Sequence, residues 1–133
     1  MKIEYLDDIS DGGKYIGVDI DKFVRIYSFD QSEAKAFQNA IRQTIAIDKK
    51  SLDLNHLNFV ETVNCNLILR ISDSDIGITT INKKDFYCDL TIHEYENMIR
   101  LIEPFCNKDT NAYQWLYNLL NDIDLLFSSD GSW

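Results

Sequence analysis

FVETVNCNLILRI (residues 59–71), followed by SDSDIG (72–77) and ITTI (78–81), is the stretch from which the fold can best be argued. In 59–71, apolar and polar side chains alternate, which is the period of a strand with one buried and one solvated face. The segment 72–77 has the composition of a turn, and 76–81 is rich in β-branched residues. We therefore predict an antiparallel hairpin whose first strand buries Phe59, Val63, Cys65, Leu67, Leu69 and Ile71.

Strands and one capped helix are predicted before this hairpin. Residues 2–9 have the pattern of a strand, and residues 15–29 alternate as one long strand or two shorter ones. Asp30 and Glu33 have the spacing of a capping box, and apolar residues then recur at helical spacing. This pattern predicts a helix over residues 31–46. The polar segment 48–58 is expected to be a loop.

A third strand and further helices are predicted after the hairpin. Residues 86–90 are predicted to add a third strand to the hairpin, which makes it an antiparallel meander. Thr91 and Glu94 have the spacing of a capping box and begin a second helix, which we expect Pro104 to stop. Another helix is predicted from residue 110 or 111 to about 123. Residues 123–128 either prolong that helix or form a strand. The strand is favoured because Asn121 and Asp122 are poor residues for a helix interior.

The order of these elements predicts an α+β fold. Runs of strands followed by helices suit an antiparallel sheet of about five to six strands with two to three helices packed mainly on one face. The chain has 133 residues, so we expect one domain spanning 1–133. The helices at 31–46 and 91–103 are the expected cover of the sheet.

The composition of the chain bears on its partners and its location. A net charge of −9 disfavours binding to nucleic acid or to an anionic membrane, and it suits association with a basic protein. The N-terminal segment has acids where a signal peptide has apolar residues, so a cytoplasmic location is expected. The three cysteines, an odd number, are expected to be reduced and packed as small hydrophobes: Cys65, Cys88 and Cys106.

Motifs for catalysis and metal binding are weak in this sequence. The Gly-Gly-Lys at 12–14 leads into a predicted strand, whereas a P-loop leads into a helix. Cys88 and His93 could supply two metal ligands, or a thiolate and a base, but no third ligand is indicated. We therefore expect no catalytic residues, no cofactor and no metal.

Acidic and aromatic residues are the remaining candidates for a binding site. Glu61 falls on the predicted buried face, where a carboxylate is costly unless it is paired. Three interpretations of Glu61 are open. The side chain is at an exposed strand end, it is paired with Arg25 or Arg70, or it has a functional role. Exposed aromatic residues of the predicted C-terminal helix are typical interface anchors, or else they cap the core. The candidate partner-binding residues are Glu61, Asp73, Asp75, Tyr113, Trp115, Asp122 and Asp124.

These features favour a small acidic protein-binding module without catalysis. Residues 91–133 carry seven acids and two bases, which suits a protein that neutralises a basic partner, in the manner of an immunity protein or antitoxin for a nuclease toxin. Two alternatives remain open at this point. The chain is a structural or homo-oligomeric subunit, or it is a hydrolase-type enzyme that uses scattered carboxylates around Glu61.

Overall fold

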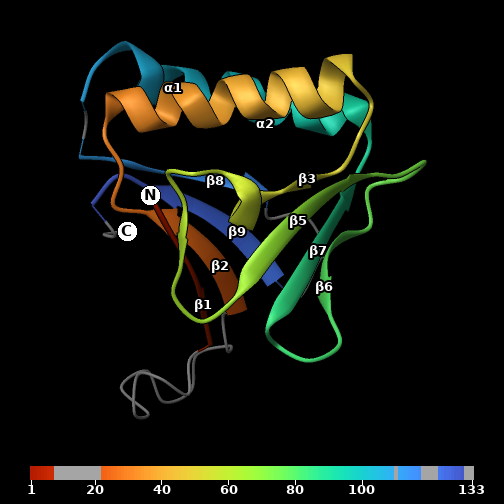
Figure 1. Cartoon of the computed structure of the whole chain (residues 1–133). Coiled ribbons are helices and arrows are strands. Elements are labelled where there is room, and N and C mark those ends of the chain that lie inside the picture. Colours follow the sequence, from red (N-terminus) through yellow and green to blue (C-terminus); the bar gives the residue numbers. More distant parts are fainter. Residues whose placement is uncertain (8–21, 110, 118–122, 131–133) are drawn as a thin grey trace.

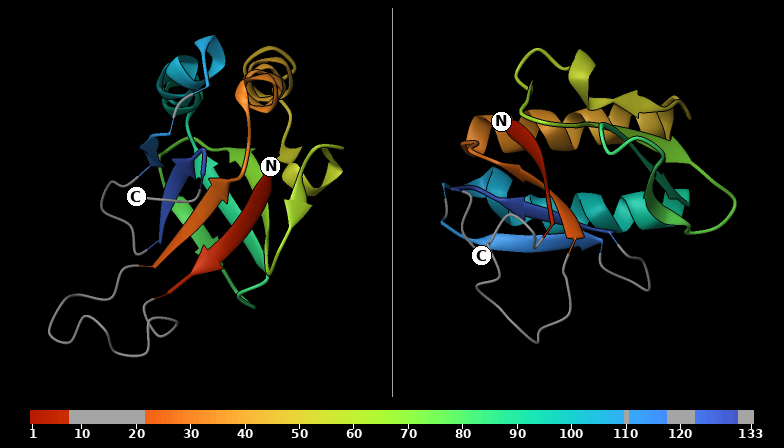
Figure 2. Two further views of the ribbon diagram at one scale, coloured as in Figure 1. Left: turned by 90° about the vertical axis from the view of Figure 1, so that its left-hand side faces the viewer. Right: turned by 90° about the horizontal axis from the view of Figure 1, so that it is seen from below.

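The computed structural model describes residues 1–7, 22–109, 111–117 and 123–130. Two long helices lie side by side over two β-sheets, as the three views in Figures 1 and 2 show. The strands are β1 (Lys2–Leu6), β2 (Lys22–Tyr27), β3 (Leu52–Asp53), β4 (Glu61–Thr62), β5 (Asn66–Ile71), β6 (Gly77–Thr80), β7 (Asp85–Leu90), β8 (Tyr113–Tyr117) and β9 (Ile123–Ser128). The helices are α1 (Gln31–Ala40), its π-helical continuation η2 (Ile41–Ile47), the 3₁₀ turn η3 (Leu54–His56) and α2 (Ile92–Asn107).

The α+β class predicted from the sequence is confirmed, but the sheet arrangement is not. A five-stranded sheet has the order β4-β1-β2-β9-β8, and a four-stranded sheet has the order β3-β5-β7-β6. Both sheets are mixed, because the pairs β1–β4, β2–β9 and β5–β7 are parallel while the other pairs are antiparallel. A single antiparallel sheet was therefore the wrong expectation. Parallel neighbours are joined by long connections, which local alternation in the sequence cannot reveal.

The predicted hairpin of 59–71 and 76–81 is also wrong. Residues 61–62 form β4 in one sheet, and residues 66–71 form β5 in the other. The alternation fails between them, where Val63 is 46% exposed, although Leu67 and Leu69 are fully buried as predicted. β7 lies between β5 and β6, and its Cys88 is opposite Leu69 on one side and Ile78 on the other. β5 and β6 are therefore not hydrogen-bonded neighbours, although they are consecutive strands in the chain.

Helix α1 forms where its sequence predicts. The Asp30 Oδ1 accepts a hydrogen bond from the Glu33 N–H at 2.8 Å, and the Glu33 carboxylate accepts one from the Asp30 N–H at 3.4 Å. This capping box satisfies backbone donors that the first helical turn leaves free. The apolar stripe continues unbroken into η2 and is fully buried at Ala34, Phe37, Ile41 and Ile45.

Helix α2 begins as predicted but does not stop at Pro104. The Thr91 Oγ1 accepts a hydrogen bond from the Glu94 N–H at 3.2 Å. Pro104 lies inside the helix on its exposed side, where solvent can bond the carbonyl that the proline leaves without a donor. Beyond it, Phe105 and Cys106 are buried, so apolar packing stabilises one more turn.

Two other expectations require correction. Residues 113–117 form strand β8, although we predicted a helix from 110 or 111 to about 123. Tyr and Trp favour strands, and a bulge between Trp115 and Tyr117 lets both Leu116 and Tyr117 point into the core. The segment 48–58 contains β3 and η3 because Leu52 and Leu54 are buried. The predicted strand at 123–128 is confirmed as β9.

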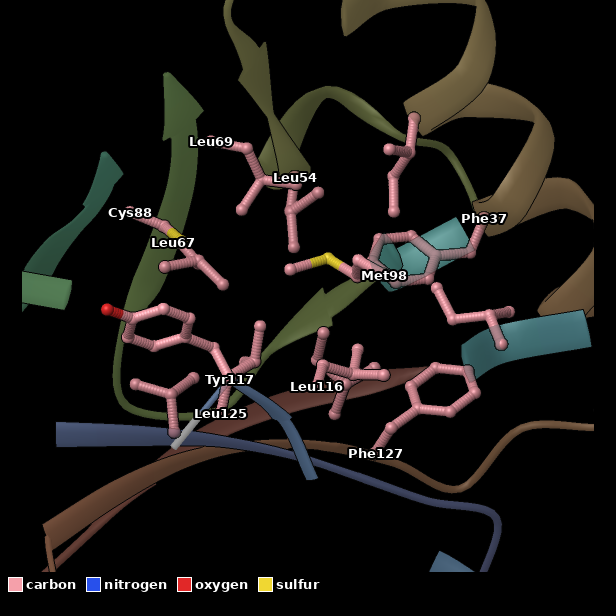
Figure 3. Packing of buried hydrophobic residues seen from close by; sticks show 14 of the residues in the cluster. Phe37, Leu54, Leu67, Leu69, Cys88, Met98, Leu116, Tyr117, Leu125 and Phe127 are labelled. Atoms are coloured by element: carbon pink, nitrogen blue, oxygen red, sulfur yellow. The ribbon is translucent and has the colours of Figure 1, made fainter. Parts of the chain in front are cut away.

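The core lies between the helices and the inner faces of the sheets (Figure 3). Phe127 of β9 is at the centre of an aromatic cluster, with its ring centroid 4.1 Å from that of Phe29, 5.8 Å from Phe37 and 4.9 Å from Phe105. These contacts connect β9 to both α1 and α2. In the part of the chain that the structure describes, no helix is long and apolar enough to cross a membrane.

Replacing Phe127 with Ala should therefore destabilise the whole fold. We expect a loss of about 3–5 kcal/mol in the free energy of unfolding, because the change removes a fully buried ring and leaves a cavity. Urea denaturation measures this. Ile81→Ala is the control, since Ile81 is 97% exposed and its loss should change stability by less than about 0.5 kcal/mol. Equal losses for the two variants would contradict this description of the core.

Candidate binding surface

The outer face of the five-stranded sheet, which points away from the helices, carries an unusual set of side chains. Strand register places Trp115 opposite Leu126, and Leu126 opposite Arg25. In the next row, Tyr113 is opposite Ser128, and Ser128 is opposite Tyr27. Directly opposed residues share a face of a sheet, so these side chains form two adjacent rows across β8, β9 and β2.

Aromatic side chains dominate these rows. Trp115 packs edge-on against Phe23, with ring centroids 5.8 Å apart, and Tyr113 remains 51% exposed. The Arg25 guanidinium lies 4.0 Å from the centroid of the Tyr27 ring, in a cation–π contact. We call Phe23, Tyr27, Tyr113 and Trp115 the aromatic face.

Arg25 and Arg70, which were alternative partners for Glu61, bind other carboxylates. Arg25 donates to Glu4 Oε1 from Nη2 at 2.7 Å and from Nε at 3.0 Å. Arg70 forms a bidentate pair with Asp89, in which Nε donates to Oδ1 and Nη2 donates to Oδ2, both at 2.7 Å. Glu61 itself is exposed on β4, at the opposite end of the sheet from β8. The burial that suggested a catalytic role for this carboxylate is therefore not observed.

The electrostatic surroundings of Tyr117, the last residue of β8, are acidic. Burial raises the pKa of the Tyr117 hydroxyl, and the negative charges of Asp75, Glu94 and Asp124 raise it further. Three acids from the turn before β6, from α2 and from β9 therefore lie within electrostatic range of one hydroxyl. Asp75 has a structural role as well, because its Oδ1 accepts hydrogen bonds from the Thr91 N–H at 2.8 Å and the Thr91 hydroxyl at 2.9 Å.

The structure thus brings together part of the predicted set of partner-binding residues. Trp115 and Asp124 both lie beside Phe23, since Asp124 is its strand partner and Trp115 contacts its ring. Asp73 is exposed in the same turn as Asp75. Glu61 is far along the sheet from this group, and Asp122 lies outside the described residues.

Sequence reasoning missed Phe23 and Tyr27 as members of this surface. The alternation in residues 15–29 placed Arg25 and Tyr27 on the face opposite Val24 and Ile26, which are fully buried. That signal identifies the solvated face of β2. It does not reveal that β8, nearly ninety residues later in the chain, lies two strands away.

The pair Cys88 and His93 does not form a reactive site. Cys88 is fully buried, whereas His93 is exposed at the start of α2. Burial raises the pKa of the Cys88 thiol to about 12, so the thiolate is scarce at neutral pH. Across residues 1–7, 22–109, 111–117 and 123–130, no three His, Cys, Asp or Glu side chains are grouped as metal ligands.

Two adjoining hollows lie where α1 begins near the end of α2. The first, of about 220 Å³, is lined by Phe29, Asp30, Gln31, Phe105, Asp109, Asn111 and Ser129. The second, of about 380 Å³, adds Ser32 and Lys35. Their carboxylates already cap the helix, because Asp109 Oδ1 accepts from the Gln31 N–H at 2.8 Å and Asp30 accepts from the Glu33 N–H. The carboxylates that line these hollows are therefore used to cap α1.

No protein-family model, curated protein or solved structure matches this chain. Its function must be argued from the aromatic face and the carboxylates beside it.

The cysteines should be unreactive in the folded protein. Burial raises the pKa of Cys65 and of Cys88 to about 12, and it also raises the pKa of Cys106. We expect slow reaction with a disulfide reagent at pH 8, and rapid reaction of three thiols once the protein is unfolded in urea. A thiol that reacts rapidly in the folded protein would contradict this.

The same shifts predict a loss of stability in alkali. The folded-state pKa of Cys65 and Cys88 lies above the ordinary value of 9.0, so the folded state retains their protons longer than the unfolded state. Their contribution to stability is fully present below about pH 9 and should decline as the pH rises from about 9 towards 12. Urea midpoints measured across this range test the sign.

Proposed function

We propose that the protein is a non-catalytic binding module that holds a basic protein against the aromatic face and the neighbouring carboxylates. The observation that carries this proposal is the arrangement around β8. Exposed Tyr113 and half-buried Trp115 lie on the outer face of this strand, and the negative charges of Asp75, Glu94 and Asp124 act on Tyr117 at the end of the same strand. Aromatic anchors are enriched at the energetically important centres of interfaces, and polar groups surround them at the rim.

Charge supports the same partner class. The net charge of −9 creates a long-range field that accelerates encounter with a basic protein and slows encounter with an acidic one. The bases on the outer face add little to oppose this, since Arg25 is already paired with Glu4. A neutralising partner of a basic toxin, such as a nuclease, is the kind of role that this combination suits.

The anchors are also held in place before binding. Trp115 packs on Phe23, and Tyr27 is fixed by its contact with Arg25. Rigid aromatic side chains lose little conformational entropy when a partner binds, so more of the contact energy is available for affinity. The aromatic face therefore suits tight binding better than flexible surface residues would.

Charge reversal tests the electrostatic part of the proposal. The immobilised protein is incubated with a lysate of its host at low salt, and bound proteins are released with a salt gradient and identified. We expect a basic protein whose association slows several-fold when Asp73 is changed to Lys. Glu61→Lys is the matched control, since it also changes the net charge from −9 to −7 but lies at the far end of the sheet. Recovery of no basic protein, salt-independent binding or equal effects of both variants would refute the proposal.

Removing an anchor tests the aromatic part. Tyr113→Ala should raise the dissociation rate of the same partner, at a cost of about 2 kcal/mol in binding free energy. Val63→Ala provides the comparison, because Val63 is similarly exposed but lies near β4. Surface plasmon resonance separates the two rate constants. If Val63→Ala weakens binding as much as Tyr113→Ala does, the partner does not bind at the aromatic face.

A further inference from the structure

Among the described strands, β8 is the last one at its end of the five-stranded sheet. β8 ends the order of its sheet, so none of the described strands is hydrogen-bonded to its outer side. The other edge strands are less suited to pairing. β3 and β4 have two residues each, and on the β6 edge Ile76 and Ile78 take part in further interactions. β8 has five residues and includes the two aromatic anchors.

The backbone groups that face this outer side can be identified from the strand pairing. The Ser129 N–H donates to the Ala112 carbonyl at 3.3 Å, so Ala112 directs its backbone groups towards β9. In an antiparallel pair this direction alternates, and Gln114, opposite Phe127, does the same. Tyr113 and Trp115 therefore direct their N–H and C=O groups outward. Consistent with this, the Trp115 carbonyl accepts a hydrogen bond at 3.1 Å from the Gln114 side chain, which occupies the position of a missing neighbour.

The charge along β8 indicates what kind of strand fits. Residues 111–117, NAYQWLY, contain no charged side chain, although the chain as a whole has 22 acids and 13 bases. Charged residues and proline are the usual means by which edge strands avoid pairing, and both are absent from this segment. A basic strand would find no carboxylate on β8 to pair with. An uncharged strand of the same sequence meets no local repulsion.

We infer that β8 pairs with β8 of a second copy of this chain, in an antiparallel and two-fold symmetric arrangement centred on Gln114. This register places Tyr113 opposite Trp115 of the other copy, and Trp115 opposite the other Tyr113. These are the residues whose backbone groups face outward, so both pairs form complete sets of backbone hydrogen bonds once the Gln114 side chain releases the Trp115 carbonyl. Gln114 then lies opposite Gln114 of the second copy, in a non-hydrogen-bonded pair, where the two side chains are close together.

The two sheets become one continuous sheet of ten strands in this dimer. Tyr113 and Trp115 keep their places on the outer face, so the aromatic faces of the two copies adjoin each other across the axis. Pairing of one short strand buries less area than the interfaces of stable complexes, which span about 1,200–2,000 Å². We therefore expect a dimer that dissociates on dilution.

The inferred dimer does not depend on the proposed function, and the effect of salt distinguishes the two. Each copy carries a charge of −9, so added salt screens the repulsion and should strengthen the dimer. Binding of a basic protein should weaken under the same change. Sedimentation velocity of the purified full chain at about 0.1 M and about 1 M salt, over a range of protein concentrations, measures the dimer directly. Failure of either proposal leaves the other intact.

Substitution of Gln114 tests the register. Gln114→Lys and Gln114→Glu each place two like charges opposite each other at the axis, and each should weaken dimerisation by about tenfold or more. A mixture of the two variants should dimerise again, because every mixed pair then has opposite charges. Thermal melting of each variant checks that the monomer still folds. A monomer at every concentration and salt, or a dimer that neither substitution weakens, overturns the inference.

Hydrogen exchange provides a test with the unaltered chain. The amides of Tyr113 and Trp115 should become protected as the protein concentration rises, while those of exposed positions on other strands, such as Thr79, should not change. A dimer that leaves the two β8 amides unprotected uses another surface, and this outcome also overturns the inference.

Discussion

Burial of Phe127 among Phe29, Phe37 and Phe105 is the interaction on which the rest of the structure depends. It joins β9 to both helices and to Phe29, which lies between β2 and α1, so it connects segments that are far apart in the chain. Because Phe127 and Leu125 of β9 face the helices, the alternate residues Leu126 and Ser128 lie on the other face of the sheet, where both are fully covered. β8 is antiparallel to β9, so its residues Tyr113 and Trp115 are placed on that outer face. The candidate binding surface is therefore a consequence of how the core is closed.

The same arrangement determines how the polar residues are used. Most carboxylates near the helices have structural partners: Asp30 and Asp109 bond the start of α1, and Asp75 bonds Thr91 before α2. The arginines on the solvated sheet faces are paired within their own sheets, Arg25 with Glu4 and Arg70 with Asp89. Partly exposed ion pairs of this kind contribute little to stability. Each of these pairs is neutral as a unit, so the net charge of −9 comes from the other charged residues of the chain.

Much of the local structure could be predicted from residues alone. The capping box at Asp30 and the N-cap bond of Thr91 are short-range hydrogen bonds, and the apolar stripe of α1 is a repeat within one segment, so these features are encoded locally. β8 was misread because five residues are too few for a reliable period, and Leu116 with Tyr117 breaks the alternation at a bulge. Pro104 was misread because a proline on the exposed side of a helix can be tolerated when the following turn is buried.

The sequence by itself determined the α+β class, the two long helices and the excess of negative charge, since these follow from periodicity and composition. It also identified Tyr113, Trp115, Asp75 and Asp124 as candidates. The tertiary structure decided which of them lie together, and it placed Glu61 at the other end of the sheet. It also placed β8 at the end of the strand order of its sheet. Strand order and parallel pairing arise from contacts between distant segments, so the pattern within each segment cannot specify them.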